Sequence, residues 1–237
     1  MSKEAEVAQG RTIADASKAA GVKHMVWSSL PHVSVISGGQ LLNVTHFDGK
    51  AEVGLYMRSL GFSALTFVEP GFFMSNLQNM MRPGPDGTYT LAWPVPANTR
   101  FPLLSAADDT GKFVASALAH PVGPNLPPPP QRIMAASGWW SGQDIVDTFT
   151  RLHGPAHTGV YSELSADAWK SLLPKEVAQE IHENFLLLRD YKYYGPDVAE
   201  EGVREALAGL DGQDKPVSLE EYLSRAGLWQ PTGAGVF

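Results

Sequence analysis

The sequence predicts an α/β protein, with a parallel sheet covered by helices in its first half and a mostly helical lobe in its second. Two short apolar runs, at 24–30 and 62–68, have the length and composition of buried strands. A helical pattern lies between them, and a strand, helix, strand order implies a right-handed crossover joining parallel strands. Helical patterns predominate after a proline-rich stretch. We therefore expect a core over 1–120 and a helical lobe with a few short strands over 121–237.

The first half alternates helices and strands. Residues 3–20 are rich in Ala, Glu and Lys, and a glycine follows where a helix would end. The run HMVWSSL at 24–30 is the first expected strand. Apolar residues recur at helical spacing over 46–60, again followed by a glycine, and the run FSALTFV at 62–68 is the second expected strand. The order along the chain is helix, strand, loop, helix, strand.

The remaining elements are shorter. We expect a short helix at 72–81, a turn before the TYTLAW run at 88–93, and a capped helix within 105–120. The stretch 121–130 contains six prolines in ten residues, which predicts an extended connector. Beyond it we expect a strand at 132–137 and three helices at 141–153, 165–173 and 175–190. A last helix is expected after Ser218, because Ser218 and Glu221 fit a capping box, and Gly227 would end it.

Composition excludes several classes of protein. The 237 residues are 43% hydrophobic and 18% charged, which is typical of a folded globular chain. The chain has no cysteine, so a disulfide scaffold, a thiolate nucleophile and a cysteine metal site are excluded. The net charge of -7 argues against nucleic acid as a partner. Because neither a long apolar span nor a secretory signal is visible, we expect no membrane association and a cytoplasmic protein, with a nuclear location also open.

One polar cluster stands out in the predicted sheet. Ser28 and Ser29 end the first strand, and His46 and Lys50 lie four residues apart at the start of the next helix. That spacing places the imidazole and the ammonium on one helix face, and the carboxyl ends of parallel strands are where such sheets build their sites. A histidine beside a cation can exchange a proton near neutral pH. The alternative is that His46 is a polar helix start and Lys50 a solvated cation.

Other patterns do not make a site. His153 and His157 have the spacing of a metal-binding pair, but Gly154 and Pro155 between them would break the helix, so no metal is expected. The GWWSG run at 138–142 is out of register with a nucleophile elbow. The sequence also contains no glycine-rich motif of the kinds that hold a diphosphate at a helix start.

Three segments together resemble the NmrA-like family, an atypical branch of the short-chain dehydrogenases and reductases. They are EAEVAQGRTIADASKAAGVKHMVWSSL at 4–30, HFDGKAEVGLYMRSLGFSALTFVEPGFFMSNL at 46–77, and SAADDTGKFVASAL at 105–118. The resemblance covers most of the first half and becomes less distinct in the second. It implies a Rossmann-like sheet that is truncated, since the family's glycine-rich dinucleotide-binding portion has no counterpart here.

The resemblance also implies roles for individual residues. His46 stands at the position of the tyrosine in the family's Y-x-x-x-K motif, and Lys50 at that of its lysine. Ser29 then falls in the region of the family's catalytic serine or threonine. Its neighbour Ser28 is expected to contact the cofactor, as is Lys50. The segment Pro70, Gly71, Phe72 and Phe73 matches the stretch beside the nicotinamide. The implied cofactor is NADP(H), and the implied catalytic set is His46, Lys50 and Ser29.

Several functions stay open at this stage. The first is a reductase-type protein that acts on or senses a small molecule, by carbonyl or enone reduction if it is an enzyme. The second is a non-catalytic regulatory or interaction protein, and the third a cofactor-free isomerase or cyclase that uses the same pocket. A truncated sheet would leave one edge of the 24–30 strand unpaired, so we expect a second copy of the chain or a protein partner to cover that edge.

Overall fold

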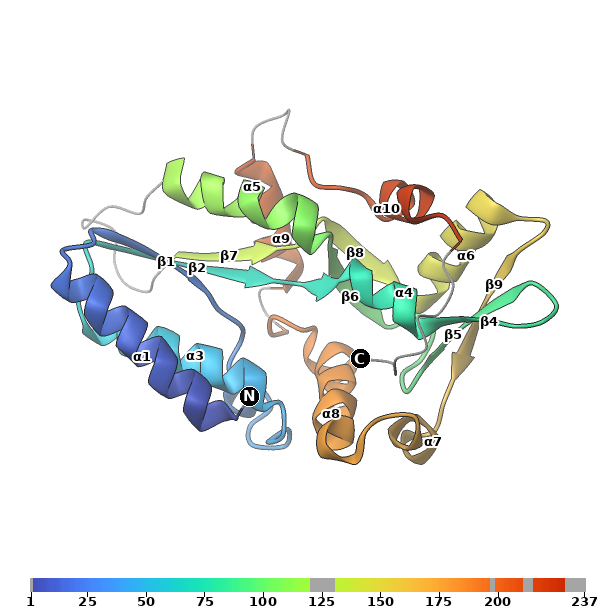
Figure 1. The fold of residues 1–237 in the computed structure, drawn as a ribbon, viewed down its shortest axis with the longest axis horizontal. Helices are drawn as coiled ribbons and strands as arrows, with labels where there is room; N and C mark the ends of the chain where they lie inside the picture. The colour runs from blue at the N-terminus through green and yellow to red at the C-terminus, as the bar shows by residue number, and fades with distance from the viewer. Residues whose placement is uncertain (1, 120–130, 197–198, 211–214, 229–237) are drawn as a thin grey trace. The chain divides into compact units, whose positions relative to one another are not determined.

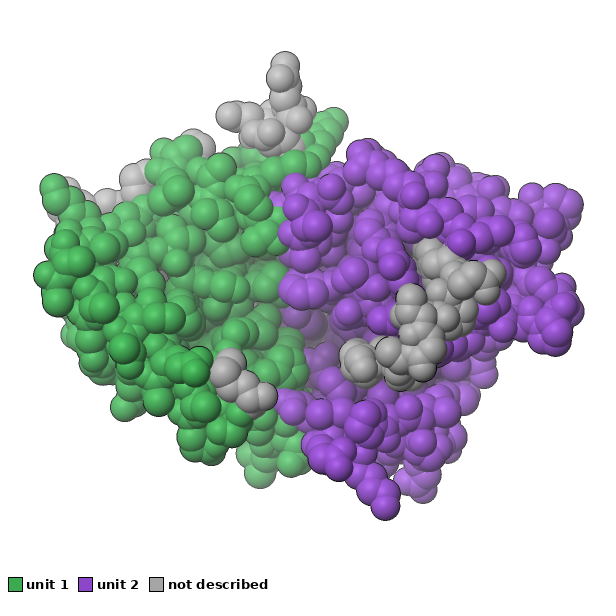
Figure 2. Space-filling view, viewed as in Figure 1, with its two compact units in different colours: residues 1–70, 110–135, 194–215 green, residues 71–109, 136–193, 216–237 purple. Residues whose placement is uncertain are grey.

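The computed structural model describes residues 2–119, 131–196, 199–210 and 215–228 (Figure 1). The chain divides into two compact units, each assembled from three segments (Figure 2). Unit 1 comprises 1–70, 110–135 and 194–215, and unit 2 comprises 71–109, 136–193 and 216–237. The division predicted at 120/121, and the extended connector predicted at 121–130, lie outside the described residues.

Unit 1 is built on a parallel three-stranded sheet in the order β1-β2-β7, from His24–Ser28, Ala64–Pro70 and Gln131–Ala135. The two apolar runs thus form neighbouring parallel strands, with Trp27 aligned with Phe67 and Phe67 aligned with Arg132. β1 lies at one end of this order, so in the described part of the chain one of its edges pairs with no strand, as expected. The helices of this unit are α1 (Lys3–Ala19), α2 (Val33–Ile36), α3 (Thr45–Ser59), most of α5 (Ala106–Ala119) and α9 (Ala199–Ala208).

Helices α1 and α3 lie side by side in unit 1 (Figure 1). Gly10 of α1 lets the two helices approach closely, because a Cβ atom there would lie 2.5 Å from the side chain of Val53. Ala14, Val53 and Met57 are fully buried between them, and Met25, Trp27 and Leu65 of the sheet pack on this cluster. The predicted helices at 3–20 and 46–60 are confirmed, because their apolar stripes are the ones that the sheet buries.

Unit 2 contains two further three-stranded sheets. One has the order β3-β6-β8, from Phe72–Phe73, Arg100–Leu104 and Gly138–Ser141. The other has the order β4-β5-β9, from Met81–Pro83, Thr88–Trp93 and Thr158–Glu163. Its helices are a 3₁₀ turn (Met74–Asn76), α4 (Leu77–Met80), α6 (Gly142–His153), α7 (Ala166–Ser171), α8 (Lys175–Tyr191) and α10 (Leu219–Ala226).

One predicted helix in this region is wrong. The segment 72–81 is not a single helix but a short strand, a 3₁₀ turn and a four-residue helix. Phe72 is drawn into β3 because it pairs with Leu103 and buries its ring among Trp93, Phe101 and Phe185. The last helix begins and ends where predicted: the Ser218 hydroxyl accepts a hydrogen bond from the Glu221 N–H at 3.1 Å, which is one of the two bonds of a capping box, and Gly227 is the C-cap.

Candidate functional site

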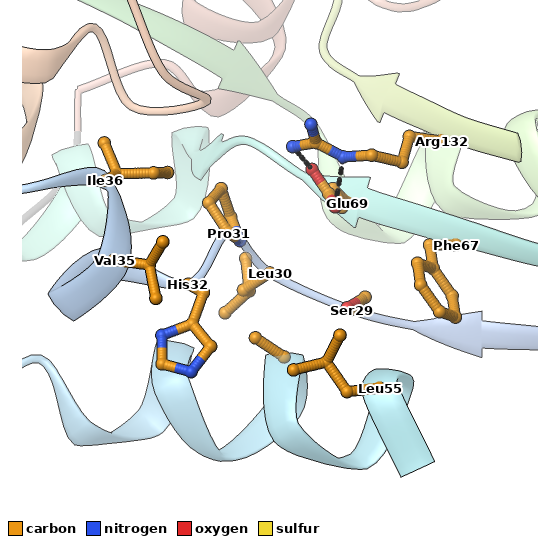
Figure 3. Close-up of a pocket in the computed structure, with 11 residues that line it drawn as sticks. Ser29, Leu30, Pro31, His32, Val35, Ile36, Leu55, Phe67, Glu69 and Arg132 are labelled. Carbon is orange, nitrogen blue, oxygen red and sulfur yellow. Dashed lines mark hydrogen bonds and ion pairs between the residues drawn. The ribbon is translucent and has the colours of Figure 1, made fainter. Parts of the chain in front are cut away.

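A pocket of about 210 Å³ lies in unit 1, where β1 and β2 end (Figure 3). The segment that follows β1 forms one wall, α2 and α3 contribute apolar side chains, and β2 and β7 supply charged ones. The lining residues are Ser29, Leu30, Pro31, His32, Val35, Ile36, Ala51, Leu55, Phe67, Glu69 and Arg132. The lining is mostly apolar with a few polar groups, which is the usual make-up of a small-molecule site.

An ion pair between a buried carboxylate and a partly exposed guanidinium forms the charged wall of this pocket. Glu69 and Phe67 are two residues apart in β2, and Arg132 is aligned with Phe67 in β7, so all three side chains leave the same face of the sheet. The Arg132 guanidinium donates from Nε and Nη2 to the two carboxylate oxygens of Glu69, at 2.9 and 2.7 Å (Figure 3). Glu69 is only 2% exposed, and its pairing with Arg132 offsets the free-energy cost of removing the carboxylate from water.

The guanidinium stays charged in this setting. Burial disfavours the cation, but the hydrogen bonds to Glu69 and the attraction of its negative charge together outweigh that effect, so the pKa of Arg132 is raised above its ordinary value. The third guanidinium nitrogen, Nη1, is not used by Glu69. An arginine fixed by two hydrogen bonds and with a further donor remaining can orient an oxygen of a bound molecule.

A second polar group in the pocket is a histidine held by a carboxylate. His32 follows Pro31 and is the N-cap residue of α2. Its Nδ1 atom lies 3.1 Å from Asp48 Oδ1 of α3 and 3.1 Å from the Ser34 hydroxyl. Asp48 is 4% exposed and also accepts a hydrogen bond from the Ser34 N–H at 3.2 Å. The carboxylate therefore fixes the imidazole and the start of α2 together.

The structure brings only one residue of the predicted catalytic set into this pocket. Ser29 is buried at the end of β1, where its N–H donates to the Val68 carbonyl at 2.9 Å, and it lines the pocket. Ser28 is exposed and is not among the lining residues. Of the other predicted cofactor contacts, Pro70 ends β2 in unit 1, whereas Gly71, Phe72 and Phe73 belong to unit 2.

His46 and Lys50 lie on a different face of α3 from the pocket. Lys50 forms an ion pair with Glu6 of α1, and the His46 ring packs edge-on against Phe47 at 4.8 Å between centroids. The pocket instead receives Ala51 and Leu55, which lie one and five residues after Lys50 and so are rotated by about 100° and about 140° from it. The roles predicted for His46 and Lys50 stay predictions.

Sequence reasoning did not select His32, Asp48, Glu69 or Arg132. Two of these could have been identified from the sequence. Glu69 and Arg132 are charged residues near the ends of otherwise apolar strands, where an unpaired charge would be destabilising. His32 and Asp48 carried none, since one lies in an irregular segment and the other is an ordinary acidic residue in the first turn of a helix.

Comparison with known proteins agrees with this fold. The model of the NmrA-like family matches residues 1–223. The NmrA-like family domain-containing oxidoreductase himF of Aspergillus japonicus is 32% identical over 211 residues, which are 84% of this chain and 62% of that protein. The nitrogen metabolite repression protein nmr of Neurospora crassa is 33% identical over 112 residues, which are 44% of this chain and 22% of that protein.

A solved structure has a similar fold. The crystal structure of NmrA, a negative transcriptional regulator, in complex with NADP aligns over 94% of this chain and 70% of its own, with a TM-score of 0.71 and 22% identity. At that identity the likeness concerns the fold alone. The chain spans about 62% of the length of the himF oxidoreductase.

Proposed function

Because this chain belongs to the NmrA-like family, we propose that its unit 1 pocket is a reductase-type site for a small molecule with a carbonyl or enone group. The observation that carries the proposal is the convergence of Ser29, His32 and the Glu69–Arg132 pair in one apolar pocket where β1 and β2 end. Open α/β sheets bind their ligands at the carboxyl ends of strands, and a few fixed polar groups in an apolar wall orient such ligands.

The pocket suits the reacting part of a small substrate better than a whole nicotinamide cofactor. Its volume of about 210 Å³ is enough for a single ring and below the 300–1,000 Å³ typical of sites for larger ligands. A diphosphate would need backbone N–H groups where a glycine-rich turn enters a helix. In the described part of unit 1, β1 leads through Ser29 to His32 into the four-residue α2, so this strand offers no such turn. A reduced nicotinamide, when bound, supplies a hydride.

The residues of the pocket would then prepare the substrate. The Ser29 hydroxyl can donate a hydrogen bond to the substrate oxygen, and Arg132 Nη1 can do the same from the opposite wall. Leu55 and Phe67 provide apolar surface that limits the access of water to the reacting carbon. Both donors are held by the sheet, Ser29 through its backbone and Arg132 through Glu69, so little reorganisation is needed.

The test is calorimetric titration with NADPH, followed by an assay of NADPH oxidation with a panel of ketones, quinones and enones. We expect the wild-type protein to bind NADPH and to reduce at least one class of compound. Ser29→Ala should lower kcat/KM about 100-fold, since one donor to the developing oxyanion is lost. Ser59→Ala, at an exposed hydroxyl at the end of α3, is the matched control. No heat of binding at millimolar NADPH would contradict the proposal.

A regulatory role is the second candidate. The relative in Neurospora crassa is a nitrogen metabolite repression protein, and it matches this chain at 33% identity. In that case the pocket would bind NADPH and no compound of the panel would be reduced. Turnover that persists in protein stripped of nucleotide would instead identify a cofactor-free enzyme.

A further inference from the structure

One stripe of α3 faces the pocket, and it contains the buried carboxylate. Ala51 and Leu55 line the pocket, and Asp48 lies three residues before Ala51, so the three residues share a helix face. Asp48 reaches His32 on the segment that follows β1, with 3.1 Å between Oδ1 and Nδ1. The imidazole is thus a part of the pocket wall whose orientation is set by a side chain of the facing helix.

This arrangement leaves one ring nitrogen of His32 for chemistry. The Nδ1 atom contacts Asp48 and the Ser34 hydroxyl, and His32 is a lining residue of the pocket, so Nε2 is the ring nitrogen left to act on a molecule bound there. The His32 side chain is 23% exposed, whereas Asp48 is almost fully covered. A buried carboxylate that accepts from one side of an imidazole fixes its tautomer and stabilises the imidazolium when the ring takes a proton.

We propose that His32 is the proton donor of this pocket and that Asp48 is its positioning residue. The assignment rests on the proposed reductase function. In the reduction of a carbonyl group, a hydride from the reduced nicotinamide adds to the carbonyl carbon and the C=O π electrons move to the oxygen. The proton on His32 Nε2 passes to that oxygen, which becomes a hydroxyl group, and His32 is left neutral. The ring is then protonated again from solvent.

The other charged groups of the pocket are poorly placed for this task. Glu69 of β2 has both carboxylate oxygens in hydrogen bonds with Arg132 of β7. Arg132 cannot release a proton near neutral pH. Asp48 of α3 is occupied by His32 and by the Ser34 N–H. Glu69 and Arg132 line the pocket with His32, and Asp48 contacts it, in the described part of the chain. Compared with these three side chains, the imidazole is the one whose type exchanges protons near neutrality.

The test is the pH profile of kcat for NADPH-dependent reduction in the wild-type chain, H32N, H32Q and D48N. A required imidazolium makes the wild-type rate fall as pH rises through the range in which histidine titrates. We expect H32Q and H32N to lower kcat about 100-fold and to abolish this decline. Asn is included because it can still serve as the N-cap of α2, so a folded variant is available if Gln disturbs the helix.

D48N tests the positioning role separately. An amide oxygen can still accept from the Ser34 N–H, so the fold is retained, but the negative charge is lost. We expect a fall of about 10-fold in kcat with a KM for NADPH within twofold of wild type, because the imidazole loses the charged group that orients it. D15N is the matched control, since Asp15 of α1 bonds to the exposed Tyr56 hydroxyl away from the pocket residues.

Each outcome decides the assignment. Loss of the pH-dependent decline in H32N and a lowered kcat at unchanged KM in D48N, with NADPH binding intact, would support it. Normal NADPH binding with an unchanged pH profile in both His32 variants would overturn the assignment while leaving the proposed function standing. Loss of the decline in His46→Gln instead would move the role to the residue predicted from sequence. Absence of NADPH binding in the wild-type protein would overturn the proposed function and this assignment with it.

Discussion

Glu69 shows how much of unit 1 depends on one pair of side chains. Its carboxylate is 2% exposed and takes both hydrogen bonds from Arg132, and its own carbonyl accepts from the Tyr194 hydroxyl at 3.2 Å. The side chain therefore ties β2 to β7, and the backbone of the same residue ties β2 to the segment before α9. A strand that ends in a buried charge is stable only while that charge has its partner.

We predict that Glu69→Gln lowers the free energy of unfolding by about 2 kcal/mol, because it leaves a partly buried guanidinium without its counter-charge. The Arg132 side chain is 35% exposed, and water that reaches it keeps the loss below that of a fully buried pair. Urea denaturation followed by circular dichroism measures the change. Glu201→Gln removes the exposed pair with Arg204 in α9 and should change stability by less than about 0.5 kcal/mol. Equal losses in the two variants would contradict the argument.

His182 of α8 makes unit 2 sensitive to acid. Burial, with the nearby cations Lys170 and Arg189, lowers the pKa of His182, and among the described residues its Nδ1 atom has no hydrogen-bond partner. Below about pH 6.5 the unfolded chain takes up a proton at this residue that the folded chain does not. The stability of the folded state therefore falls as the pH decreases, by at most about 1.4 kcal/mol per pH unit from this group.

The corresponding prediction concerns how steeply the free energy of unfolding changes with pH. Between about pH 6.5 and pH 5, His182→Gln should lose stability less steeply than the wild-type protein, because one proton-uptake site of the unfolded chain is removed. Urea midpoints measured across that range give the slope. His24 also has a pKa lowered by burial, so a smaller slope is expected to remain in the variant. Parallel curves for the two proteins would rule out His182 as a contributor.

At the scale of elements, the close contact of α1 and α3 positions the face of α3 that carries Ala51 and Leu55 of the pocket. Gly10→Ala would place a methyl group 2.5 Å from Val53, and the helices would have to move apart. We predict a loss of about 1–3 kcal/mol, which outweighs the gain in helix propensity. Gly111→Ala in α5 is the matched control, since nothing lies within 4 Å of a Cβ atom there, and it should stabilise the chain by about 1 kcal/mol. Thermal unfolding of both variants tests the contrast.

Elements with a strong periodic pattern were predictable from the sequence. The helix at 175–190 appears as Lys175–Tyr191, and the helix within 105–120 appears as Ala106–Ala119. Periodicity succeeds where burial repeats along one segment. It fails at 72–81, where Phe72 and Phe73 adopt a strand because a partner about 30 residues later in the sequence, Leu103–Leu104, pairs with them. The same holds for the site. Ser29 could be predicted because it lies at a strand end, whereas the contacts of His32 with Asp48 and of Glu69 with Arg132 join segments that are distant in the sequence.

At the scale of the whole molecule, each unit draws on segments from both halves of the chain. Sheet β1-β2-β7 needs β7, and α9 packs on β7 with Gly202 against the side chain of Met134. In the described residues no helix is long and apolar enough to cross a membrane. The interleaving of segments could not be read from the sequence, because composition changes along the chain indicate linkers and not which segments return to an earlier sheet.

We predict that a fragment of residues 1–119 does not unfold cooperatively. It retains β1 and β2 but lacks β7 and α9, so β2 loses its neighbouring strand and the buried Glu69 carboxylate loses Arg132. A two-stranded sheet is marginal without further strands. Urea denaturation of the fragment should show a broad, shallow change in ellipticity, in contrast to a sharp transition for the intact chain. A sharp transition in the fragment would show that the first half folds on its own.

Trp27 has a consequence for optical work on this protein. By sequence and unit ranges it is the one tryptophan of the six that belongs to unit 1, and its indole N–H donates to the Lys50 carbonyl at 3.2 Å. That bond joins β1, which Ser29 of the pocket directly follows, to α3, which contributes Leu55 to the pocket. The difference between the emission spectra of the wild-type protein and W27F therefore isolates unit 1. A small molecule that moves α3 against the sheet would change this difference spectrum even if it absorbs no light itself.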